Sequence, residues 1–451
     1  MKILMTGVTG LIGCRVGRKL VEEGHEIRIV SRNEKKAKQS VPFPCEVIEW
    51  DLLQKPLGQK VFKDVEVVIH LLGETVNGRW SKSKKEAILN SRKISSQNLL
   101  KNMPATVKTV ISASAVGFYG DRGDEVLDES SAAGQSFLAE VCQVWESEVK
   151  KLSGNQRTLI IRIGVVLSRQ GGALKKLIPL FQKNLGAVLG SGQQWMSWIS
   201  LNDLCRLICE AVKNEQYLGV VNGVQPTPVT NQQFTEVLGQ SLNVMTLPSV
   251  PRLALKTLLG EMSEIVLASQ KVLSPALKKL GFSFEDKELA VFLKKELEPY
   301  ENGQGFFSAE QFIEAPIKNV FNFFSAAENL EKITPPLLSF KVENMSTPHI
   351  EKGTLIDYKL KIHGVPASWQ TLIDEWQPPF RFVDMQLKGP YKLWHHTHVF
   401  KEFAGGTLMM DEVKFKLPMG FLGRLVAGSF VESDVGQIFD FRRQIIADQK
   451  F

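Results

Sequence analysis

Three glycines near the start of the chain have the spacing of a phosphate-binding turn. Gly7, Gly10 and Gly13 form a G-x-x-G-x-x-G pattern directly after the apolar run 2–5. Glycines at a strand-to-helix turn let backbone N–H groups approach a pyrophosphate at the helix N-terminus. The pattern predicts a dinucleotide-binding turn, and the alternative is a tight turn that serves only close helix packing.

A basic residue after the next apolar run indicates which dinucleotide is bound. That run ends in Val30, Ser31 and Arg32, where an NAD-binding protein would carry an acidic residue. Arginine offers a charge-assisted fork to a 2′-phosphate, and Lys35 and Lys36 add positive potential. The sequence predicts NADP(H) rather than NAD(H), the alternative being a solvated basic loop.

These residues belong to an alternation of short apolar runs and segments of helical length. The apolar runs lie at 2–5, 26–30, 65–72, 109–112 and 158–163. This alternation favours a parallel sheet covered by helices on both faces. We predict an α/β Rossmann fold with a doubly wound parallel sheet over about residues 1–165, followed by a small substrate lobe over about 166–297.

The composition changes after the lobe. Residues 298–305 (EPYENGQG) concentrate Pro, Gly, Asn and Gln, which is typical of a linker. A strand at 306–313, a helix at 317–325, alternating segments up to residue 415 and a last helix at about 433–447 follow. This order predicts an α+β domain over 306–451, in which one curved antiparallel sheet wraps the C-terminal helix.

Residues 1–297 carry further motifs that resemble the extended short-chain dehydrogenase/reductases, and within them an atypical NAD-dependent epimerase/dehydratase-like group with a DUF1731-type lobe. The motifs are TGVTGLIG in the turn, WDL at 50–52, HLLGE at 70–74, SASAVGFYG at 112–120 and the lobe segment 260–282. The resemblance implies an adenine near Asp51 and Leu52, a ribose along Leu72 and Gly73, and a nicotinamide near 164–166. The implied cofactor residues are Gly7, Thr9, Gly10, Leu11, Ile12, Gly13, Arg32, Asp51, Leu52, Leu72, Gly73, Ser112, Gly164, Val165 and Val166.

The catalytic pattern of the extended enzymes is broken in this chain. They use a Y-x-x-x-K pair in which the lysine and the cofactor lower the pKa of the tyrosine, but Phe137 and Val141 stand at the corresponding positions. The remaining catalytic candidates are Ser114, which could polarise a carbonyl, and Tyr119 and Glu74, which could transfer a proton. The alternatives are a strand-end turn for Ser114 and Tyr119 and a solvated carboxylate for Glu74.

Residues 306–451 resemble the helix-grip superfamily, the SRPBCC group of START-like and polyketide-cyclase-like ligand binders. The resemblance depends on two segments, 312–336 and GPYKLWHHTHVF at 389–400. A sheet that grips a helix can leave a cavity for a hydrophobic ligand. The side chains that could line the cavity, or else form an ordinary core, are Phe321, Phe324, Trp369, Trp376 and Trp394.

The histidines and cysteines lack the spacing of a metal site. His396 and His398 share one face of their strand and His395 takes the other, but no carboxylate or further histidine lies near them in the sequence. Cys205 and Cys209 stand one helical turn apart without other ligands nearby. We therefore predict no metal and expect reduced, mostly buried thiols.

Composition narrows the classes of function. The 451 residues are 43% hydrophobic and 23% charged, which excludes global disorder and predicts at least two domains. No apolar run approaches the length of a membrane-spanning helix, and the first residues do not resemble a signal peptide, so we expect a cytoplasmic protein. The net charge of +7 is spread widely, which argues against nucleic-acid binding.

Together these patterns favour an NADP(H)-dependent epimerase or oxidoreductase that acts on a small carbonyl or sugar-type substrate. The appended domain would bind a hydrophobic ligand. Two other functions are compatible with the missing Tyr and Lys: a cofactor-binding sensor without turnover, and a ligand carrier regulated by its Rossmann domain.

Overall fold

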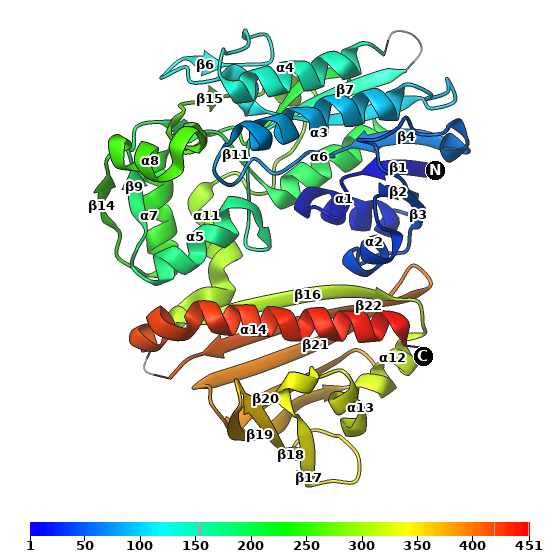
Figure 1. Cartoon of the computed structure of the whole chain (residues 1–451), viewed down its shortest axis with the longest axis vertical. Coiled ribbons are helices and arrows are strands. Elements are labelled where there is room, and N and C mark those ends of the chain that lie inside the picture. The colour runs from blue at the N-terminus through cyan, green and yellow to red at the C-terminus, as the bar shows by residue number, and fades with distance from the viewer. Residues whose placement is uncertain (153–155, 419, 450) are drawn as a thin grey trace. The chain divides into compact units, whose positions relative to one another are not determined.

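The computed structural model describes residues 1–152, 156–418, 420–449 and 451 and divides the chain into two compact units (Figure 1). Unit 1 comprises residues 1–38 and 45–297, and unit 2 comprises residues 39–44 and 298–451. The segment expected as a linker contains the 3-10 helix η4 (Glu298–Gly303) and the first residue of strand β16. Among the described helices, none combines the length and the apolar character that crossing a bilayer requires.

Unit 1 is built on a seven-stranded sheet in which all neighbouring strands are parallel. In spatial order the strands are β12 (Gly219–Gly223), β7 (Arg157–Ile163), β5 (Thr109–Ala115), β4 (Val65–His70), β1 (Lys2–Thr6), β2 (Glu26–Ser31) and β3 (Glu46–Glu49). The prediction of a doubly wound α/β fold is confirmed. One edge strand, β12, comes from the segment that was assigned to the lobe, because the chain returns to the sheet after residue 213.

Helices cover the sheet of unit 1. They are α1 (Leu11–Glu22), α2 (Glu34–Ser40), α3 (Lys82–Leu100), α4 (Phe137–Lys150) and α6 (Leu201–Lys213). In α6 the fully buried side chains recur every three or four residues, at Leu204, Leu207, Ile208 and Ala211, so the helix presents one continuous apolar face. Cys205 and Cys209 are also buried, and all five cysteines are free thiols.

The lobe of unit 1 consists of short helices and two-stranded sheets. Its helices are α5 (Gly172–Gln182), α7 (Asn231–Leu242), α8 (Arg252–Leu259), α9 (Glu264–Leu267), α10 (Pro275–Lys279) and α11 (Leu289–Leu297). The strand pairs are β8 (Val165–Ser168) with β11 (Trp198–Ser200), β9 (Ala187–Leu189) with β14 (Leu247–Val250), β10 (Trp195–Met196) with β13 (Val229–Thr230), and β6 (Val126–Leu127) with β15 (Lys271–Val272).

Unit 2 is built on a seven-stranded antiparallel sheet. Its strands, in spatial order, are β16 (Gly305–Ile313), β22 (Gly406–Lys416), β21 (Leu393–Phe403), β20 (Arg381–Lys388), β19 (Val365–Gln377), β18 (Leu355–Ile362) and β17 (Lys341–Met345). Helices α12 (Ile317–Phe324), α13 (Ala327–Lys332) and α14 (Gly420–Asp448) complete the unit. The expected antiparallel sheet and C-terminal helix are present, whereas β17 was missed because KVENM has little apolar alternation.

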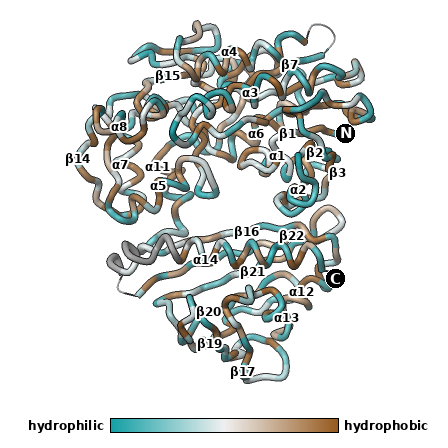
Figure 2. Tube along the Cα trace, in the orientation of Figure 1, coloured by the Kyte–Doolittle hydropathy of each residue, from teal (hydrophilic) through white to brown (hydrophobic). Residues whose placement is uncertain are grey.

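Helix α14 packs one face on this sheet. It starts at Gly420 rather than at about residue 433, and the buried residues in its C-terminal half are Val435, Phe439, Arg442 and Ile446. This spacing of four, three and four residues defines one helix face, and Figure 2 shows hydrophobic and hydrophilic segments alternating along that half. Phe439 stacks on Phe307 of β16, with ring centroids 4.7 Å apart. The helix therefore brings the Arg442 guanidinium into the interior of unit 2.

Candidate cofactor site and active site

The glycine turn joins β1 to α1 and leaves the start of the helix open. A Cβ atom on Gly7 or Gly13 would lie 2.6 Å or 2.5 Å from backbone atoms, so both glycines are required by the local packing. Gly10 is the N-cap of α1, and a Cβ there would meet only the Gly7 carbonyl oxygen, at 3.3 Å. No side chain caps the helix and no acidic residue occupies its first turn. Its free N–H groups can therefore receive an anion.

Arg32 follows the end of β2, two strands from β4 in the same sheet. Its side chain is exposed and makes no hydrogen bond or ion pair with any part of the chain that the structure describes. Elsewhere in β2, Arg28 binds Glu46 at 2.7 Å and is buried. The guanidinium of Arg32 thus remains available for a ligand phosphate.

The other predicted cofactor residues follow the carboxyl ends of neighbouring parallel strands. Thr9, Leu11 and Ile12 lie in the turn and the first turn of α1, Asp51 and Leu52 follow β3, Leu72 and Gly73 follow β4, Ser112 lies in β5, and Gly164, Val165 and Val166 follow β7. The topology therefore places these residues along one edge of the sheet, where open α/β folds bind ligands. Two of these side chains are buried: Leu52 is 2% exposed in the core, and Ser112 is 1% exposed with its hydroxyl donating to the Ala113 carbonyl at 3.1 Å.

Ser114 and Tyr119 are held in a buried network centred on an ion pair. Arg162 of β7 binds Glu146 of α4 through two hydrogen bonds of 2.8 and 2.9 Å. Ser114 donates to Glu146 at 2.8 Å, and Tyr119 accepts from Arg162 at 3.0 Å and donates to Asn222 at 2.7 Å. Neither hydroxyl is free for a substrate in this arrangement, since Tyr119 is fully buried and Ser114 is 2% exposed.

The network also sets the protonation of its members. Burial raises the pKa of Tyr119, although its hydrogen bond from Arg162 acts in the opposite direction. Burial would also raise the pKa of Glu146, but the hydrogen bonds and charge of Arg162 outweigh it and hold that pKa below its usual range. Tyr119 is therefore a neutral hydrogen-bonding group and Glu146 a carboxylate at neutral pH. The cation that the nearby sequence lacked is Arg162, whose hydrogen bond and charge lower the pKa of Tyr119 but do not outweigh the effect of burial.

The positions of the missing Tyr and Lys are filled by packing. Val141 is 2% exposed in a cluster with Trp80 and Ile88, and Phe137 packs edge-on against Trp80 with centroids 5.2 Å apart. The ammonium of Lys85 lies 4.9 Å from the centre of the Phe137 ring. No group that could transfer a proton stands at either position.

Glu74 follows β4 and is the most accessible of the three catalytic candidates. Its side chain is 42% exposed, and its carboxylate binds Lys84 of α3 at 2.6 Å. Its backbone is fixed by Ser91, which accepts from the Glu74 N–H at 2.8 Å, and by Arg92, which donates to the Glu74 carbonyl at 3.1 Å. The carboxylate is thus held at the edge of the sheet while it remains open to solvent.

Sequence reasoning missed Arg162, Glu146 and His70. Arg162 interrupts the apolar run TLIIRI, and a charge in a buried strand signals a buried partner. His70, at the end of β4, lies between Thr6, whose Oγ1 is 2.7 Å from Nδ1, and Ser96, whose Oγ is 3.0 Å from Nε2. Burial lowers the pKa of His70 to about 4, so the ring is neutral.

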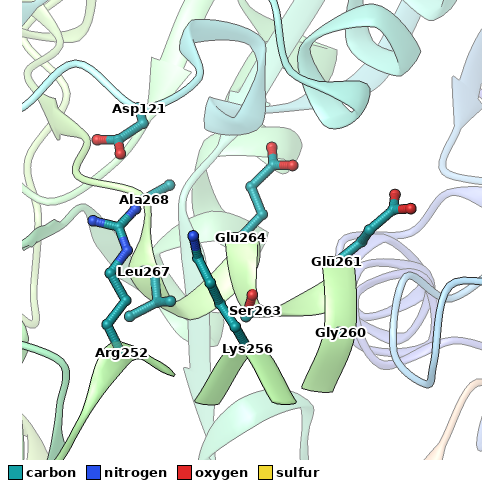
Figure 3. A pocket seen from close by; sticks show the side chains of 9 residues that line it. All are labelled: Asp121, Arg252, Lys256, Gly260, Glu261, Ser263, Glu264, Leu267 and Ala268. Atoms are coloured by element: carbon teal, nitrogen blue, oxygen red, sulfur yellow. The ribbon is translucent and has the colours of Figure 1, made fainter. Parts of the chain in front are cut away.

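A cavity of about 390 Å³ with charged and apolar lining residues lies between the lobe and the loop that follows Tyr119 (Figure 3). In Figure 3 the Arg252 side chain of α8 extends toward Asp121, and Lys256 of the same helix lies beside it. Glu261, on the same wall, binds Lys85 of α3 at 2.7 Å. Residues of both charge signs therefore line the cavity.

With this geometry established, comparisons with known proteins assign the family. The sequence model of the NAD dependent epimerase/dehydratase family matches residues 3–222, and that of a domain of unknown function, DUF1731, matches residues 250–296. The Arabidopsis thaliana protein called Epimerase family protein SDR39U1 homolog, chloroplastic, is 42% identical over 299 residues, which cover 64% of this chain and 84% of the relative. The chain belongs to the NAD dependent epimerase/dehydratase family.

Two further epimerase-family relatives match a similar share of this chain. The Mycobacterium bovis protein Mb2239 is 36% identical over 287 residues, covering 62% of this chain and 93% of that protein. The crystal structure of human epimerase family protein SDR39U1 (isoform 2) with NADPH has a TM-score of 0.60 and 28% identity, and covers 66% of this chain and 99% of the human one. The two family models end at residues 222 and 296, so they leave the antiparallel sheet of unit 2 outside this epimerase-family region.

Proposed function

We propose that this epimerase-family chain binds NADP(H) along the carboxyl edge of the unit 1 sheet. Two observations together support this proposal. The N-terminus of α1 has no side-chain cap, and Arg32, which follows β2, is exposed and unpaired among the described residues. The N–H groups of α1 would hold the pyrophosphate, and Arg32 would hold the 2′-phosphate. The human relative that was solved with NADPH supports this choice of dinucleotide.

The proposed chemistry is that of an oxidoreductase or epimerase on a small carbonyl or sugar-type substrate. A bound nicotinamide would supply or accept the hydride. We assign proton transfer to Glu74, because its carboxylate is open to solvent, whereas the Ser114 and Tyr119 hydroxyls are closed in the Arg162 network. The cavity beside Arg252 and Asp121 is the proposed substrate pocket, since its lining offers both donors and acceptors.

A titration with NADPH and NADH tests the cofactor assignment. We expect tighter binding of NADPH, and we expect Arg32→Ala to weaken it about 10- to 100-fold with little change for NADH, because a hydrogen bond to a charged group contributes about 1.5–3 kcal/mol. Lys101→Ala is the matched control, because this exposed lysine follows the C-terminal end of α3, on the opposite edge of the sheet. Equal affinities of the unaltered protein for the two dinucleotides would contradict the proposal.

A substrate screen tests the chemistry. With carbonyl compounds and nucleotide sugars as candidates, Glu74→Gln should lower turnover about 10²- to 10⁴-fold while NADPH affinity stays constant. Tight NADPH binding without turnover on any compound would instead favour a cofactor-binding sensor, for which the packed Phe137 and Val141 are the motivating observation.

For unit 2 we propose the SRPBCC, START-like helix-grip fold with a hydrophobic ligand. The support is the order of seven antiparallel strands followed by a long helix packed on the sheet. Trp369, Trp394 and Tyr391 form an aromatic cluster with centroids 4.9–5.7 Å apart, whereas Phe321 and Phe324 are 2% exposed in the core. We therefore expect a hydrophobic fluorescent probe to bind near Trp394 and to be displaced by a hydrophobic ligand of unit 2.

A further inference from the structure

A cluster of two histidines and two aspartates lies in the interior of unit 2. His396 and His398 are two residues apart on β21 and share one face of the sheet. The strand register places Asp384 of β20 opposite His396 and Asp411 of β22 opposite His398. The carboxylates that were missing near these histidines in the sequence thus come from the neighbouring strands.

Each histidine lies between the two carboxylates. Asp384 Oδ2 is 3.4 Å from His396 Nδ1 and 3.0 Å from His398 Nε2. Asp411 Oδ1 is 3.0 Å from His396 Nε2 and 2.8 Å from His398 Nδ1. All four ring nitrogens therefore face a carboxylate oxygen.

Protons alone satisfy this arrangement poorly. Two neutral imidazoles supply two N–H groups for the four approaches, and protonating both rings would place two cations with centroids 3.8 Å apart. Only the contacts of His396 Nε2 with Asp411 and of His398 Nε2 with Asp384 have hydrogen-bond geometry. The buried His398 Nδ1 has no hydrogen-bond partner among the described residues. On the Asp384 side, the cluster has no Lys or Arg ion-pair partner among the described residues.

We propose that Asp384, His396 and His398 bind a divalent transition-metal ion of the Zn²⁺ type through Asp384 Oδ2, His396 Nδ1 and His398 Nε2. These three ligand atoms lie within 4.8 Å of one another. Tetrahedral ligands at metal distances of about 2.0–2.1 Å are about 3.3 Å apart, which matches the 3.0 and 3.4 Å separations at Asp384.

Asp411 then completes the site without binding the metal. With both rings ligated on the Asp384 side, His396 Nε2–H is free to donate to Asp411, the arrangement that orients histidine ligands in metal proteins, and His398 Nδ1 lies 2.8 Å from the same carboxylate oxygen. Arg442 lies 3.7 Å from Asp411 and balances its charge, while Asp384 has no Lys or Arg ion-pair partner in the described chain. The Asp384 side chain is 19% exposed, against 7% and 4% for the histidines, so an ion would enter on its side.

Cobalt titration of the full-length protein tests the proposal. After treatment with a chelator, we expect one Co²⁺ per chain with the visible d–d bands of a nitrogen- and oxygen-ligated ion, displaced by equimolar Zn²⁺. Asp384→Asn and His396→Gln should each weaken binding by at least about 100-fold, and Asp411→Asn by about 10- to 100-fold. His395→Gln is the matched control on the opposite face of the same strand and should leave binding unchanged.

Other results would overturn the site. These are the absence of 1:1 binding, retention of binding in both Asp384→Asn and His396→Gln, or a thiolate-to-cobalt band that assigns the ion to cysteine. X-ray absorption of the Zn²⁺-loaded unaltered protein provides a measurement that does not depend on how the variants fold. It should show two imidazoles and oxygen in the first shell, and a shell containing sulfur or a single imidazole would contradict the assignment.

Discussion

Each unit of this chain buries a cluster of charged groups, and the two clusters differ in how completely they are satisfied. In unit 1, Arg162 forms two hydrogen bonds to Glu146 and one to Tyr119, and each of these groups has a further partner. In unit 2, His398 Nδ1 and the Nε and Nη1 atoms of Arg442 are buried without a hydrogen bond to any described residue.

The difference separates a structural role from a binding role. A closed network such as that of Arg162 specifies one arrangement of its strands and helices and leaves no position for a ligand. Unsatisfied buried polar atoms are expensive, and they persist in proteins where a ligand or an ion completes them. Ser114 and Tyr119, the predicted catalytic residues, belong to the fully hydrogen-bonded network of Arg162. His396 and His398, for which no metal was predicted, belong to the cluster that has unsatisfied buried atoms.

Breaking the ion pair of unit 1 should have the largest effect. Glu146→Gln leaves Arg162 buried and charged, and we expect a loss of about 3–5 kcal/mol in the free energy of unfolding of unit 1. Asp411→Asn should destabilise unit 2 less, because the neighbouring imidazoles can lose a proton and Arg442 lies 3.7 Å from Asp411 without a hydrogen bond to it. Hydrogen exchange on peptides from α4 and from β20–β22 would measure the two effects separately. Glu140→Gln, an exposed change on α4, serves as the control, and equal losses in the two units would refute the contrast.

The second-largest expected difference between the two units is in the pH dependence of their stability. Burial, assisted by the charge of Arg92, lowers the pKa of His70 to about 4, and its unfolded value is near 6.5. The unfolded state therefore takes up the proton first, so the stability of unit 1 is full above pH 6.5 and falls by up to about 3 kcal/mol as the pH drops toward 4. His70→Asn should remove this part of the slope in denaturation experiments between pH 7 and 4.5. An unchanged slope would show that His70 titrates over the same pH range in the folded and unfolded states.

Of the two histidines of unit 2, His396 shares the direction of the His70 pKa shift and His398 does not. Burial and the neighbouring His398 lower the pKa of His396, whereas Asp384 and Asp411 outweigh burial at His398 and raise its pKa. Their contributions to the pH dependence of stability therefore oppose each other. The difference between His398 and His70 reflects their partners. His398 lies beside two carboxylates, whereas Thr6 and Ser96 contact His70 with hydroxyl groups.

The smallest expected effect is that of removing the Tyr119 hydroxyl from the hydrogen-bond network of Arg162. Tyr119→Phe removes the hydroxyl that joins Arg162 to Asn222, and we expect unit 1 to lose about 1–2 kcal/mol with NADPH affinity unchanged. Tyr391→Phe in unit 2 is the comparison, since the Tyr391 hydroxyl makes no hydrogen bond among the described residues, and its effect should stay within about 0.5 kcal/mol. A loss of cofactor binding in Tyr119→Phe would place the residue in the site after all.

Local patterns in the sequence sufficed for the first strands and helices and for the family. The glycine turn needs only seven consecutive residues, because their backbone packing and the helix start are set within β1 and α1. Alternation of period two likewise revealed most strands of unit 2, because one face of each strand is buried. The replacement of the Tyr and Lys pair by Phe137 and Val141 was evident from the spacing alone.

Tertiary structure decided which buried polar groups have all their hydrogen-bond partners and which do not. Arg162 meets Tyr119 and Glu146 across 43 and 16 residues of sequence because parallel pairing and helix packing bring β5, β7 and α4 together. Asp384 meets the histidines only through the antiparallel register of β20 on β21. A slip of one residue would turn a strand's side chains to the opposite face. Such long-range register is set by the packing of the whole core and cannot be found from the residues next to each group.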